Sequence, residues 1–568
     1  MRMHFNNRIL FCLCISAGLF LFSSCEGNNF LSSQQQELFT SEGHNVTAKV
    51  SIVPQPVDIT VGRGFFTLKP DTVIVSQENT SALARDLSKM LSVATDYHLE
   101  VTKKTRAENS IVLQINSELK HLGTEGYRLK ITLEQVKLQA PSTNGIFYGI
   151  VTIRQLLPAE IFREAKVKNI KWLMPCLEIE DYPRFSWRGM HIDVGRYFMP
   201  KEFIKKYIDL LALHKMNIFH WHLTEDQGWR IEIKKYPKLT QVGAWRKETV
   251  AGHLSKKPMK FDGVRHGGFY SQDDIREIVE YARRRYVTVV PEIEMPGHAQ
   301  AAIASYPELG NTGKKLPVRT YWGVNKNIFN PQDSTILFLQ DVLSEVLELF
   351  PGDFIHIGGD EAVKDQWKNS EKVQARIKAL GLKDEHELQS YFIKRMDTFL
   401  VSKGRRLIGW DEILEGGLAP GAAVMSWRGE KGGVAAAKAG HDVVMAPTDY
   451  TYFDYYQGDP KKEPLAIGGY LPLQKVYSYN PIPAGLTQKQ AKHILGAQGQ
   501  VWTEYIPTPK KAEYMAFPRA CALSEVLWTP MEKKDYKNFI DRLHIHLKRL
   551  GILDVNYHPL YSETSFRE

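Results

Sequence analysis

The sequence His356-Ile357-Gly358-Gly359-Asp360-Glu361 places two carboxylic acids side by side, directly after two glycines. Neighbouring carboxyl groups perturb each other's pKa, and a carboxylic acid that keeps its proton can act as a general acid. An acidic pair alone is equally typical of a solvated loop or of a helix N-terminus. The significance of Asp360 and Glu361 therefore depends on the elements that position them and on what else those elements carry.

Short apolar, β-branched runs followed by polar residues or glycines predict eight strands in the second part of the chain. They lie at 187–194, 216–222, 287–293, 354–357, 406–410, 423–426, 442–445 and 494–498. The second and the sixth could also be loops. Helical patterns separate most of them, at 200–214, 272–285, 334–349, 387–401 and 432–439. This alternation predicts an α/β fold, a (β/α)8 TIM barrel, because an open doubly wound sheet would carry a glycine-rich turn after its first strand.

Residues that could do chemistry follow every one of these strands. In chain order they are Asp193, Arg196, Glu225, Asp226, Glu294, His298, Asp360, Glu361, Trp410, Trp427, Tyr452, Asp454, Trp502 and Glu504. The active site of such a barrel lies at the carboxyl ends of its strands, so we expect these side chains to converge. Aromatic faces, carboxylates and an arginine suit a sugar pocket, and an acid can protonate a leaving oxygen. The pattern indicates cleavage of a glycosidic bond.

The chain from Arg184 onward resembles glycoside hydrolase family 20, the β-N-acetylhexosaminidases. The motifs that carry the resemblance are WRGMHIDVGR at 187–196, HWHLTEDQGWR at 220–230, VPEIEMPGH at 290–298, HIGGDE at 356–361, GWDE at 409–412 and VWTE at 501–504. The resemblance implies an exo-acting enzyme on terminal N-acetylglucosamine or N-acetylgalactosamine. A disaccharide-releasing member of the family is the alternative.

The resemblance also explains why the two acids are adjacent. Consecutive carboxyl groups suit neither the retaining nor the inverting separation of a two-carboxylate glycosidase. In this family the 2-acetamido oxygen of the substrate is the nucleophile and forms a cyclic oxazolinium intermediate. By resemblance, Glu361 is the general acid and then the base, so we expect its pKa to be raised. Asp360 is expected to accept a hydrogen bond from the acetamide N–H.

The remaining roles follow from the same resemblance. Tyr452 is expected to donate to the acetamide oxygen inside a pocket walled by Trp410, Trp427 and Trp502. We expect the sugar hydroxyls to bind Arg196, Asp454 and Glu504. Supporting positions behind the pocket are expected for Asp193, Asp226, Glu294, His298 and His356. His298 is expected to pair with Glu294 and to tune the acid, and no cofactor or metal is implied.

Two positions depart from the commonest family pattern. Glu225 and Glu294 stand where an Asp is frequent, so each carboxylate reaches one methylene further. A different class of enzyme is suggested by His220 and His222, because alternate residues of a strand share a face and can bind a metal. That interpretation predicts a metal-dependent amidohydrolase. A non-catalytic sugar-binding protein is a third possibility, but it would be expected to have lost Asp360 or Glu361.

Composition supports a folded protein of several domains. The chain has 568 residues, of which 43% are hydrophobic and 24% charged, which is typical of globular proteins. Its net charge of +9 is spread without a dense Lys/Arg block, so a nucleic-acid partner is not expected. Residues 49–182 alternate short strands and helices and predict a small, non-catalytic α+β domain. Residues 183–568 are expected to form the catalytic barrel and a C-terminal helix at 534–550.

The first residues predict export. Arg2 and Arg8 precede an apolar run, 9–22, that is too short for a comfortable membrane span and fits a signal peptide over 1–24. The sequence before Cys25 resembles a bacterial lipoprotein processing site, although Phe22 replaces the usual Leu. We expect lipidation of Cys25, a tether over 25–48, and anchoring in the cell envelope, in the periplasm or on the outer-membrane surface. Secretion without lipid is the alternative. Cys176 and Cys521 are expected to be free and buried.

Overall fold

The computed structural model describes residues 39–42, 45–48 and 50–560. The chain divides into two compact units, residues 1–49 and 50–568. In the first unit, β1 (Phe39–Glu42) and β2 (Asn45–Ala48) pair antiparallel, so a hairpin lies within the segment expected to be a tether. Cys25 and the apolar run before it lie outside the described residues.

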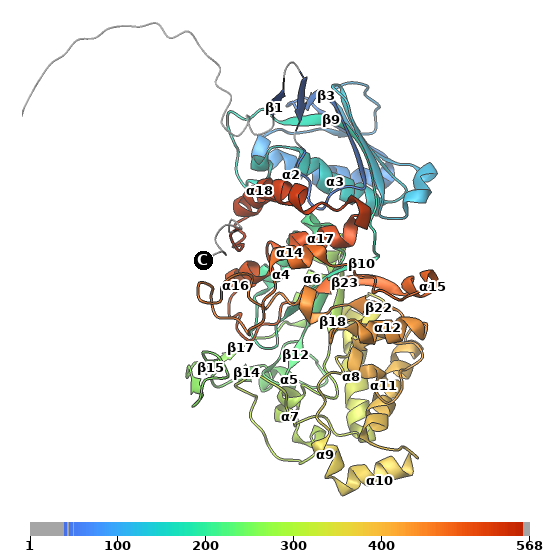
Figure 1. The fold of residues 1–568 in the computed structure, drawn as a ribbon, viewed down its shortest axis with the longest axis vertical. Helices are drawn as coiled ribbons and strands as arrows, with labels where there is room; N and C mark the ends of the chain where they lie inside the picture. Colours follow the sequence, from blue (N-terminus) through green and yellow to red (C-terminus); the bar gives the residue numbers. More distant parts are fainter. Residues whose placement is uncertain (1–38, 43–44, 49, 561–568) are drawn as a thin grey trace, which may run out of the picture. The chain divides into compact units, whose positions relative to one another are not determined.

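The larger unit contains a closed barrel of eight parallel strands (Figure 1). In barrel order they are β10 (Trp187–Asp193), β11 (Ile218–His222), β18 (Thr288–Glu292), β19 (Phe354–His356), β20 (Arg406–Trp410), β21 (Ala423–Ser426), β22 (Val443–Met445) and β23 (Ile494–Gly499). The predicted TIM barrel is thus confirmed. The two segments that could have been loops are strands β11 and β21.

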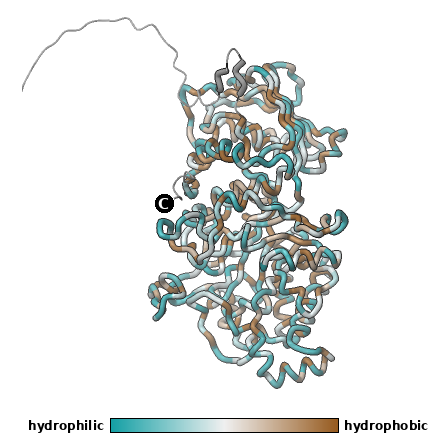
Figure 2. Tube along the Cα trace, viewed as in Figure 1, coloured by the Kyte–Doolittle hydropathy of each residue, from teal (hydrophilic) through white to brown (hydrophobic). Residues whose placement is uncertain are grey.

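Helices surround the barrel. They include α4 (Lys201–Leu213), α6 (Gln272–Arg283), α8 (Asp333–Leu349), α11 (Glu385–Ser402), α12 (Lys431–Lys438) and α17 (Arg519–Trp528). The C-terminal α18 (Tyr536–Ile552) packs against η3 (Ala159–Phe162) of the region before the barrel. Helix α6 shows why these segments are helical, because Ser271 and Asp274 form a capping box and Ile275, Ile278 and Ala282 are buried at helical spacing. Within single helices the chain passes between hydrophobic and hydrophilic residues (Figure 2).

The barrel interior is layered. An apolar cluster that includes Trp187, Val290, Ile408 and Met425 fills part of it. Towards the carboxyl ends the buried residues become polar, such as His220 and His222 on β11, which alternate with outward-packed Phe219 and Trp221. Because side chains alternate across a strand, one strand can supply both the outer core and the site. The polar layer is therefore held on a rigid frame.

A seven-stranded sheet forms the core of the region before the barrel. Its order is β3 (Asp58–Thr67), β9 (Leu173–Asp181), β7 (Tyr127–Ile131), β8 (Gln135–Ala140), β6 (Ser110–Ile115), β4 (Val73–Ser76) and β5 (Val101–Thr102). Helices α2 (Ser81–Thr95) and α3 (Thr143–Leu156) pack against this sheet through buried apolar faces. This is the expected α+β architecture.

A buried ion pair joins the sheet region to the barrel. Asp181, the last residue of β9, accepts hydrogen bonds from Lys215 Nζ (2.7 Å), Tyr127 Oη (2.7 Å) and Trp528 Nε1 (2.8 Å). Both Lys215 and Asp181 are completely buried. The two parts of the larger unit are thus connected by a charge pair whose carboxylate has several donors.

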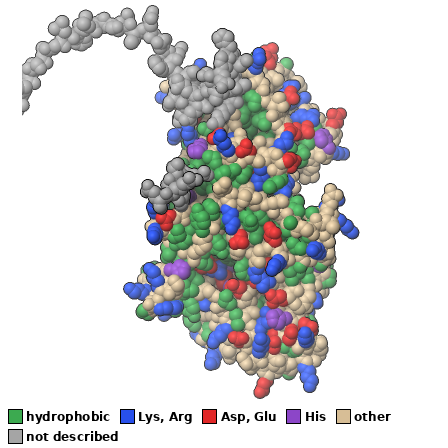
Figure 3. All heavy atoms as spheres, in the orientation of Figure 1, with side chains coloured by type: hydrophobic (Ala, Val, Ile, Leu, Met, Phe, Trp, Pro, Cys, Tyr) green, Lys and Arg blue, Asp and Glu red, His purple; other side chains and the backbone are tan. Residues whose placement is uncertain are grey.

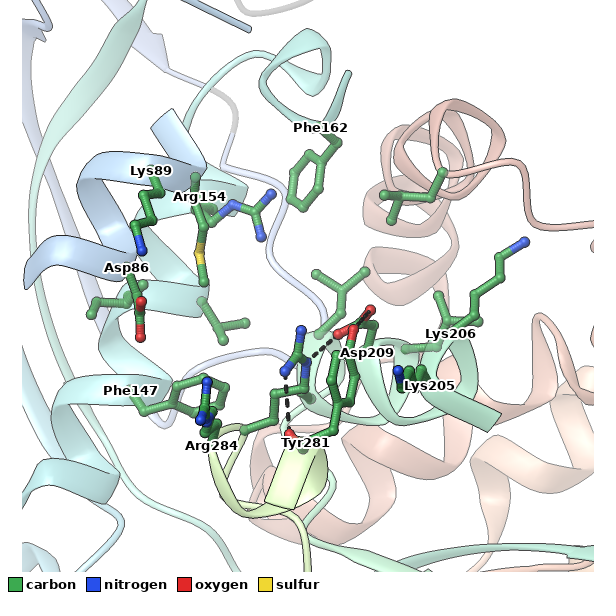
Figure 4. A pocket seen from close by; sticks show the side chains of 18 of the residues that line it. Asp86, Lys89, Phe147, Arg154, Phe162, Lys205, Lys206, Asp209, Tyr281 and Arg284 are labelled. Carbon is green, nitrogen blue, oxygen red and sulfur yellow. Dashed lines mark hydrogen bonds and ion pairs between the residues drawn. The ribbon is translucent and has the colours of Figure 1, made fainter. Parts of the chain in front are cut away.

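A cavity of about 960 Å³ lies where α2 and α3 face α4 and α6 (Figure 4). Its lining mixes apolar residues with acids and bases, among them Asp209, which pairs with Arg285. Arg154 points into the same space with its guanidinium 4.5 Å from the centre of the Phe162 ring. None of the predicted site residues lines this cavity, so it is separate from the barrel mouth.

The surface seen in Figure 3 intersperses acidic and basic side chains rather than gathering one sign. Both cysteines in the described part of the chain, Cys176 and Cys521, are free and buried, as expected. Among the residues that the structure describes, the helices are too short or too polar to cross a bilayer.

Candidate active site

The acid pair sits on a tight turn after β19. Gly358 and Gly359 adopt φ values of +66° and +95°, and Glu361 itself has φ +45°, a region that disfavours a side chain. A Cβ atom on Gly358 would lie 1.8 Å from Glu294 Oε2, so this position requires glycine. The turn separates the two acids: the side chain of Asp360 is 12% exposed and that of Glu361 is 33% exposed.

His298 is the residue that connects both acids to the rest of the site. Its Nε2 lies 3.4 Å from Asp360 Oδ2 and 3.5 Å from Glu361 Oε2. Its Nδ1 donates to Glu225 Oε1 at 2.7 Å. The predicted pairing of His298 with Glu294 is therefore wrong, because the carboxylate of Glu294 turns to Gly358 and the long side chain of Glu225 reaches the imidazole instead.

The charge on His298 reverses the expected pKa shift of the acid. Burial lowers the pKa of His298, but Glu225 and Asp360 outweigh burial and raise it well above the ordinary value. Burial also raises the pKa of Glu361, yet the hydrogen bond and charge of His298 lower it overall. The expected raised pKa of Glu361 is thus wrong for this structure. The protonated imidazole within 3.5 Å favours the carboxylate form of Glu361.

Glu292, at the end of β18, organises the floor of the site. It accepts hydrogen bonds from His222 Nδ1 (2.6 Å) and Trp410 Nε1 (2.8 Å), and its oxygens lie 3.0 Å from His220 Nε2 and 2.8 Å from His356 Nδ1. Burial would raise the pKa of this carboxyl, but the three imidazoles lower it well below the ordinary value. The sequence interpretation gave Glu292 no role, although its place on the third strand and the alternate His220 and His222 were available signals.

Side chains around Glu292 also have the spacing of a metal-binding group. Ligand atoms of His220, Glu292 and His356 lie within 4.8 Å of one another, as do those of His191, His222 and Glu292. In the structure the imidazole of His222 donates to Glu292, and that of His220 lies 3.0 Å from the same carboxylate. The His-x-His pair can therefore be explained as support for a carboxylate that in turn fixes Trp410.

The four predicted aromatic residues form one continuous wall. The ring centres of Trp410 and Trp502 are 5.7 Å apart, and those of Tyr452 and Trp502 are 6.5 Å apart. Trp427 stacks on Tyr452 with an interplanar angle of 22°. Trp427 Nε1 donates to Glu412 Oε2 at 2.9 Å. A wall of this kind can hold a small apolar group such as an acetyl methyl.

Arg196 lies over Trp502, with its guanidinium carbon 5.0 Å from the centre of the indole ring. It contacts Asp193 at 3.2 Å, Glu225 at 3.3 Å and Glu504 at 3.3 Å. Asp454 belongs to the same group, since burial and the Glu504 charge raise its pKa well above the ordinary value. These residues form a compact patch of charge beside the aromatic wall.

Several buried oxygens of this patch accept no hydrogen bond from the chain. They are Asp360 Oδ1, Asp454 Oδ1 and Glu504 Oε2. Buried polar atoms are normally satisfied, so unsatisfied acceptors grouped in one place indicate a polar ligand. Sugar hydroxyls and an amide N–H supply the donors that these oxygens need.

The supporting residues have identifiable contacts. Asp193 accepts from Thr503 Oγ1 at 3.0 Å as well as from Arg196, and so links the first and last strand ends. Asp226 accepts from Arg319 Nη1 at 3.0 Å and from the backbone N–H of Gln300 at 2.9 Å. All predicted site residues within the described chain thus belong to one connected group, and Cys25 lies outside the described residues.

Models of one protein family match both parts of the larger unit. The model described as "Glycosyl hydrolase family 20, catalytic domain" matches residues 185–531, and "Glycosyl hydrolase family 20, domain 2" matches residues 49–182. The chain belongs to glycosyl hydrolase family 20. The first match spans the barrel strands and every predicted side chain of the site.

Individual family 20 proteins agree with this assignment. A beta-hexosaminidase of Porphyromonas gingivalis is 46% identical over 513 residues, which are 90% of this chain and 64% of that protein. This chain therefore spans just under two thirds of that relative. The exo beta-N-acetylglucosaminidase of Vibrio harveyi, solved in complex with N-acetylglucosamine, superposes with a TM-score of 0.78 at 32% identity and covers 92% of this chain and 81% of its own. A beta-N-acetylhexosaminidase of Bacteroides fragilis gives 0.77 at 31%, covering 91% and 99%.

Proposed function

We propose that this family 20 protein is an exo-acting β-N-acetylhexosaminidase that hydrolyses terminal N-acetylglucosamine or N-acetylgalactosamine with retention. The observation that supports this proposal most is the placement of the acid pair. The side chain of Asp360 is largely buried, whereas that of Glu361 is partly exposed beside His298. The names of the Porphyromonas and Vibrio proteins support the same activity.

In the first step the acetamide oxygen of the bound sugar attacks its own anomeric carbon. Glu361 gives a proton to the glycosidic oxygen as that bond breaks, and the aglycone leaves as an alcohol. The acetamide becomes a cyclic oxazolinium ion. Asp360 accepts the hydrogen bond of its N–H and balances its positive charge. Tyr452 and the aromatic wall hold the acetamide in line, which raises the effective concentration of the nucleophile.

In the second step Glu361, now a carboxylate, takes a proton from water. The water oxygen attacks the anomeric carbon from the face that the aglycone left, and the bond to the acetamide oxygen breaks. Two inversions give net retention. Glu361 is thereby protonated again, and the enzyme is ready for the next turnover.

Recognition of the non-reducing end explains the exo action. Arg196, Glu504 and Asp454 present charge and unsatisfied acceptors to the ring hydroxyls. A sugar whose hydroxyls are held at this end leaves only its anomeric side open to a further residue. Endo cleavage would place another sugar where these side chains are packed.

A panel of aryl β-glycosides with and without the 2-acetamido group tests this function. We expect cleavage of the β-N-acetylglucosaminide and no comparable cleavage of the plain β-glucoside, because the latter lacks the nucleophile. Equal rates on the two substrates would refute substrate assistance.

Activity should also survive exhaustive chelation, since the proposed steps use only side chains and substrate. Loss on chelation, with recovery on adding Zn²⁺, would favour the amidohydrolase alternative.

We propose in addition that the protein is exported and lipid-anchored through Cys25 in a bacterial cell envelope. The signal-like run over 9–22 and the small residues before Cys25 support this. Expression in a bacterial host with an alkyne-labelled fatty acid should label the wild type and not Cys25→Ala. Labelling of both proteins, or of neither, would overturn the proposal.

A further inference from the structure

Glu412 lies on a short helical turn, η5 (Asp411–Leu414), that packs directly against the acid pair. The backbone N–H of Trp410 donates to the carbonyl of Gly358 at 2.9 Å. Ile413 fits so closely against Gly359 that a Cβ there would lie 2.6 Å from Ile413 Cγ2. The turn that carries Glu412 is thus fixed to the segment that carries Asp360 and Glu361.

The carboxyl group of Glu412 has one close partner. Its Oε2 accepts from Trp427 Nε1 at 2.9 Å, and the residue is only 8% exposed. Its Oε1 lies 3.7 Å from Arg428 Nε, but Arg428 is held more closely by Asp411 at 2.6 Å and by Glu415 at 3.2 Å. Glu412 therefore buries a carboxyl group whose charge is poorly compensated.

The surroundings favour the protonated form of this carboxyl group. Burial and then the nearby Asp360 carboxylate raise the pKa of Glu412 to about 8, and Asp411 acts in the same direction. The Trp427 hydrogen bond and the Arg428 charge oppose the shift without cancelling it. Glu412 also affects the pKa of Lys364. Burial lowers this pKa, and the charges of Glu415 and Glu412 partly offset the effect of burial.

We propose that Glu412, in its neutral form, is a positioning residue that holds the indole of Trp427 against the substrate acetamide and leaves the negative charge on Asp360. The proposal rests on the hexosaminidase function above. Trp427 stacks on Tyr452, so a displaced indole would loosen the wall that aligns the nucleophile. The neutral acid also avoids a second negative charge next to the carboxylate that must receive the acetamide N–H.

Ionisation of Glu412 should weaken this arrangement. The Trp427 hydrogen bond itself favours the anion, but an anionic Glu412 is repelled by the Asp360 carboxylate. Turning towards Arg428, whose Nε lies 3.7 Å from Oε1, relieves this repulsion and takes the acceptor away from Trp427. Activity should therefore fall as pH rises through about 8. The charged groups that face Glu412 are Asp360, Asp411, Arg428 and Lys364. Despite burial, the pKa of Arg428 is raised by the surrounding carboxylates, and that of Lys364 is lowered by burial.

The decisive experiment compares the pH dependence of kcat/KM for Glu412→Gln and wild type on an aryl β-N-acetylglucosaminide. The amide keeps an acceptor for Trp427 but cannot ionise. We expect the fall near pH 8 to disappear in Glu412→Gln, with activity at pH 6 within about threefold of wild type. Glu412→Met, which has the size but no acceptor, should also lack the fall near pH 8 and should raise KM about tenfold.

Glu415→Gln is the matched control, because Glu415 contacts the same Arg428 but not Trp427. It should keep the wild-type profile. An unchanged alkaline fall in both Glu412 variants would overturn the role of Glu412 while leaving the hexosaminidase function intact. A wild-type protein that cleaves no acetamido glycoside would overturn the function itself.

Discussion

At the scale of single residues, the pair His298–Glu361 determines how a proton reaches the leaving group. His298 carries the charge that lowers the pKa of Glu361, and it stands 3.5 Å from that carboxylate. The adjacent acids thus depend on a third residue from another strand end. Asp360 shares the same imidazole at 3.4 Å, so the site holds both carboxylates around one cation.

Replacing the acid should abolish proton transfer but leave binding. Glu361→Gln should reduce kcat/KM on an alkyl β-N-acetylglucosaminide by about 10²–10⁴-fold, the usual contribution of a general acid. An aryl glycoside with a good leaving group should lose much less in the first step. Steady-state kinetics on the two substrates checks this, and a wild-type rate on the alkyl substrate would show that Glu361 is not the acid.

Replacing the imidazole should change the pH profile. In His298→Asn the influence that lowers the Glu361 pKa is gone, so burial raises that pKa. The fall in kcat/KM that reports ionisation of Glu361 should therefore move to higher pH, and the maximal kcat/KM should drop about 10–100-fold because the imidazole no longer positions the two acids. A drop that is uniform at all pH values would contradict this role and would indicate a structural one.

At the scale of elements, the turn after β19 shows how backbone geometry presents the acids. Gly358→Ala should place a methyl group against the Glu294 carboxylate in a left-handed backbone region. We expect a loss of more than about 1–3 kcal/mol in the free energy of unfolding and loss of activity. Gly381→Ala is the control, because Gly381 has a similar φ of +67° but a Cβ there would meet no atom within 4 Å. Urea unfolding of both variants separates the effect of the clash with Glu294 from that of backbone strain. Equal losses in the free energy of unfolding would refute the requirement for glycine at position 358.

Element boundaries in the barrel followed from the sequence with small errors. The strand predicted at 406–410 is β20 (Arg406–Trp410), and that at 423–426 is β21 (Ala423–Ser426). Buried parallel strands are short apolar runs bounded by polar residues or glycines at both ends. Each strand can therefore be recognised from residues that are neighbours in the sequence. The convergence of the site residues was predictable for the same reason, because barrel topology alone brings strand ends together.

The sequence could not predict which carboxylate is the hydrogen-bond partner of His298. His298 binds Glu225 and not Glu294, although both acids precede it and both carry the longer side chain. That choice depends on the space left by Gly358 and on side-chain reach across neighbouring strands. The direction of the Glu361 pKa shift was missed for the same reason, since burial and the His298 charge oppose each other and only the geometry decides between them.

At the scale of the whole molecule, the Lys215–Asp181 pair connects the sheet region to the barrel. Breaking one side of a completely buried pair leaves a charge without compensation, which typically costs about 3–5 kcal/mol. Lys215→Met should lower the free energy of unfolding by that amount, and adding Asp181→Asn should restore part of it. Urea unfolding measures both effects. Lys130→Met, which breaks the exposed pair with Glu178, should change stability by less than about 1 kcal/mol, and a similar loss there would contradict the special role of burial.

The central claim is that the substrate acetamide is the nucleophile, held by Asp360 and the aromatic wall. The most direct test compares kcat/KM for two aryl β-glucosaminides that differ only in carrying an N-acetyl or an N-trifluoroacetyl group. Fluorine withdraws electrons from the carbonyl oxygen and weakens it as a nucleophile without removing the amide. We predict a fall of at least about 100-fold for the trifluoroacetyl substrate. Equal rates for the two substrates would contradict the mechanism.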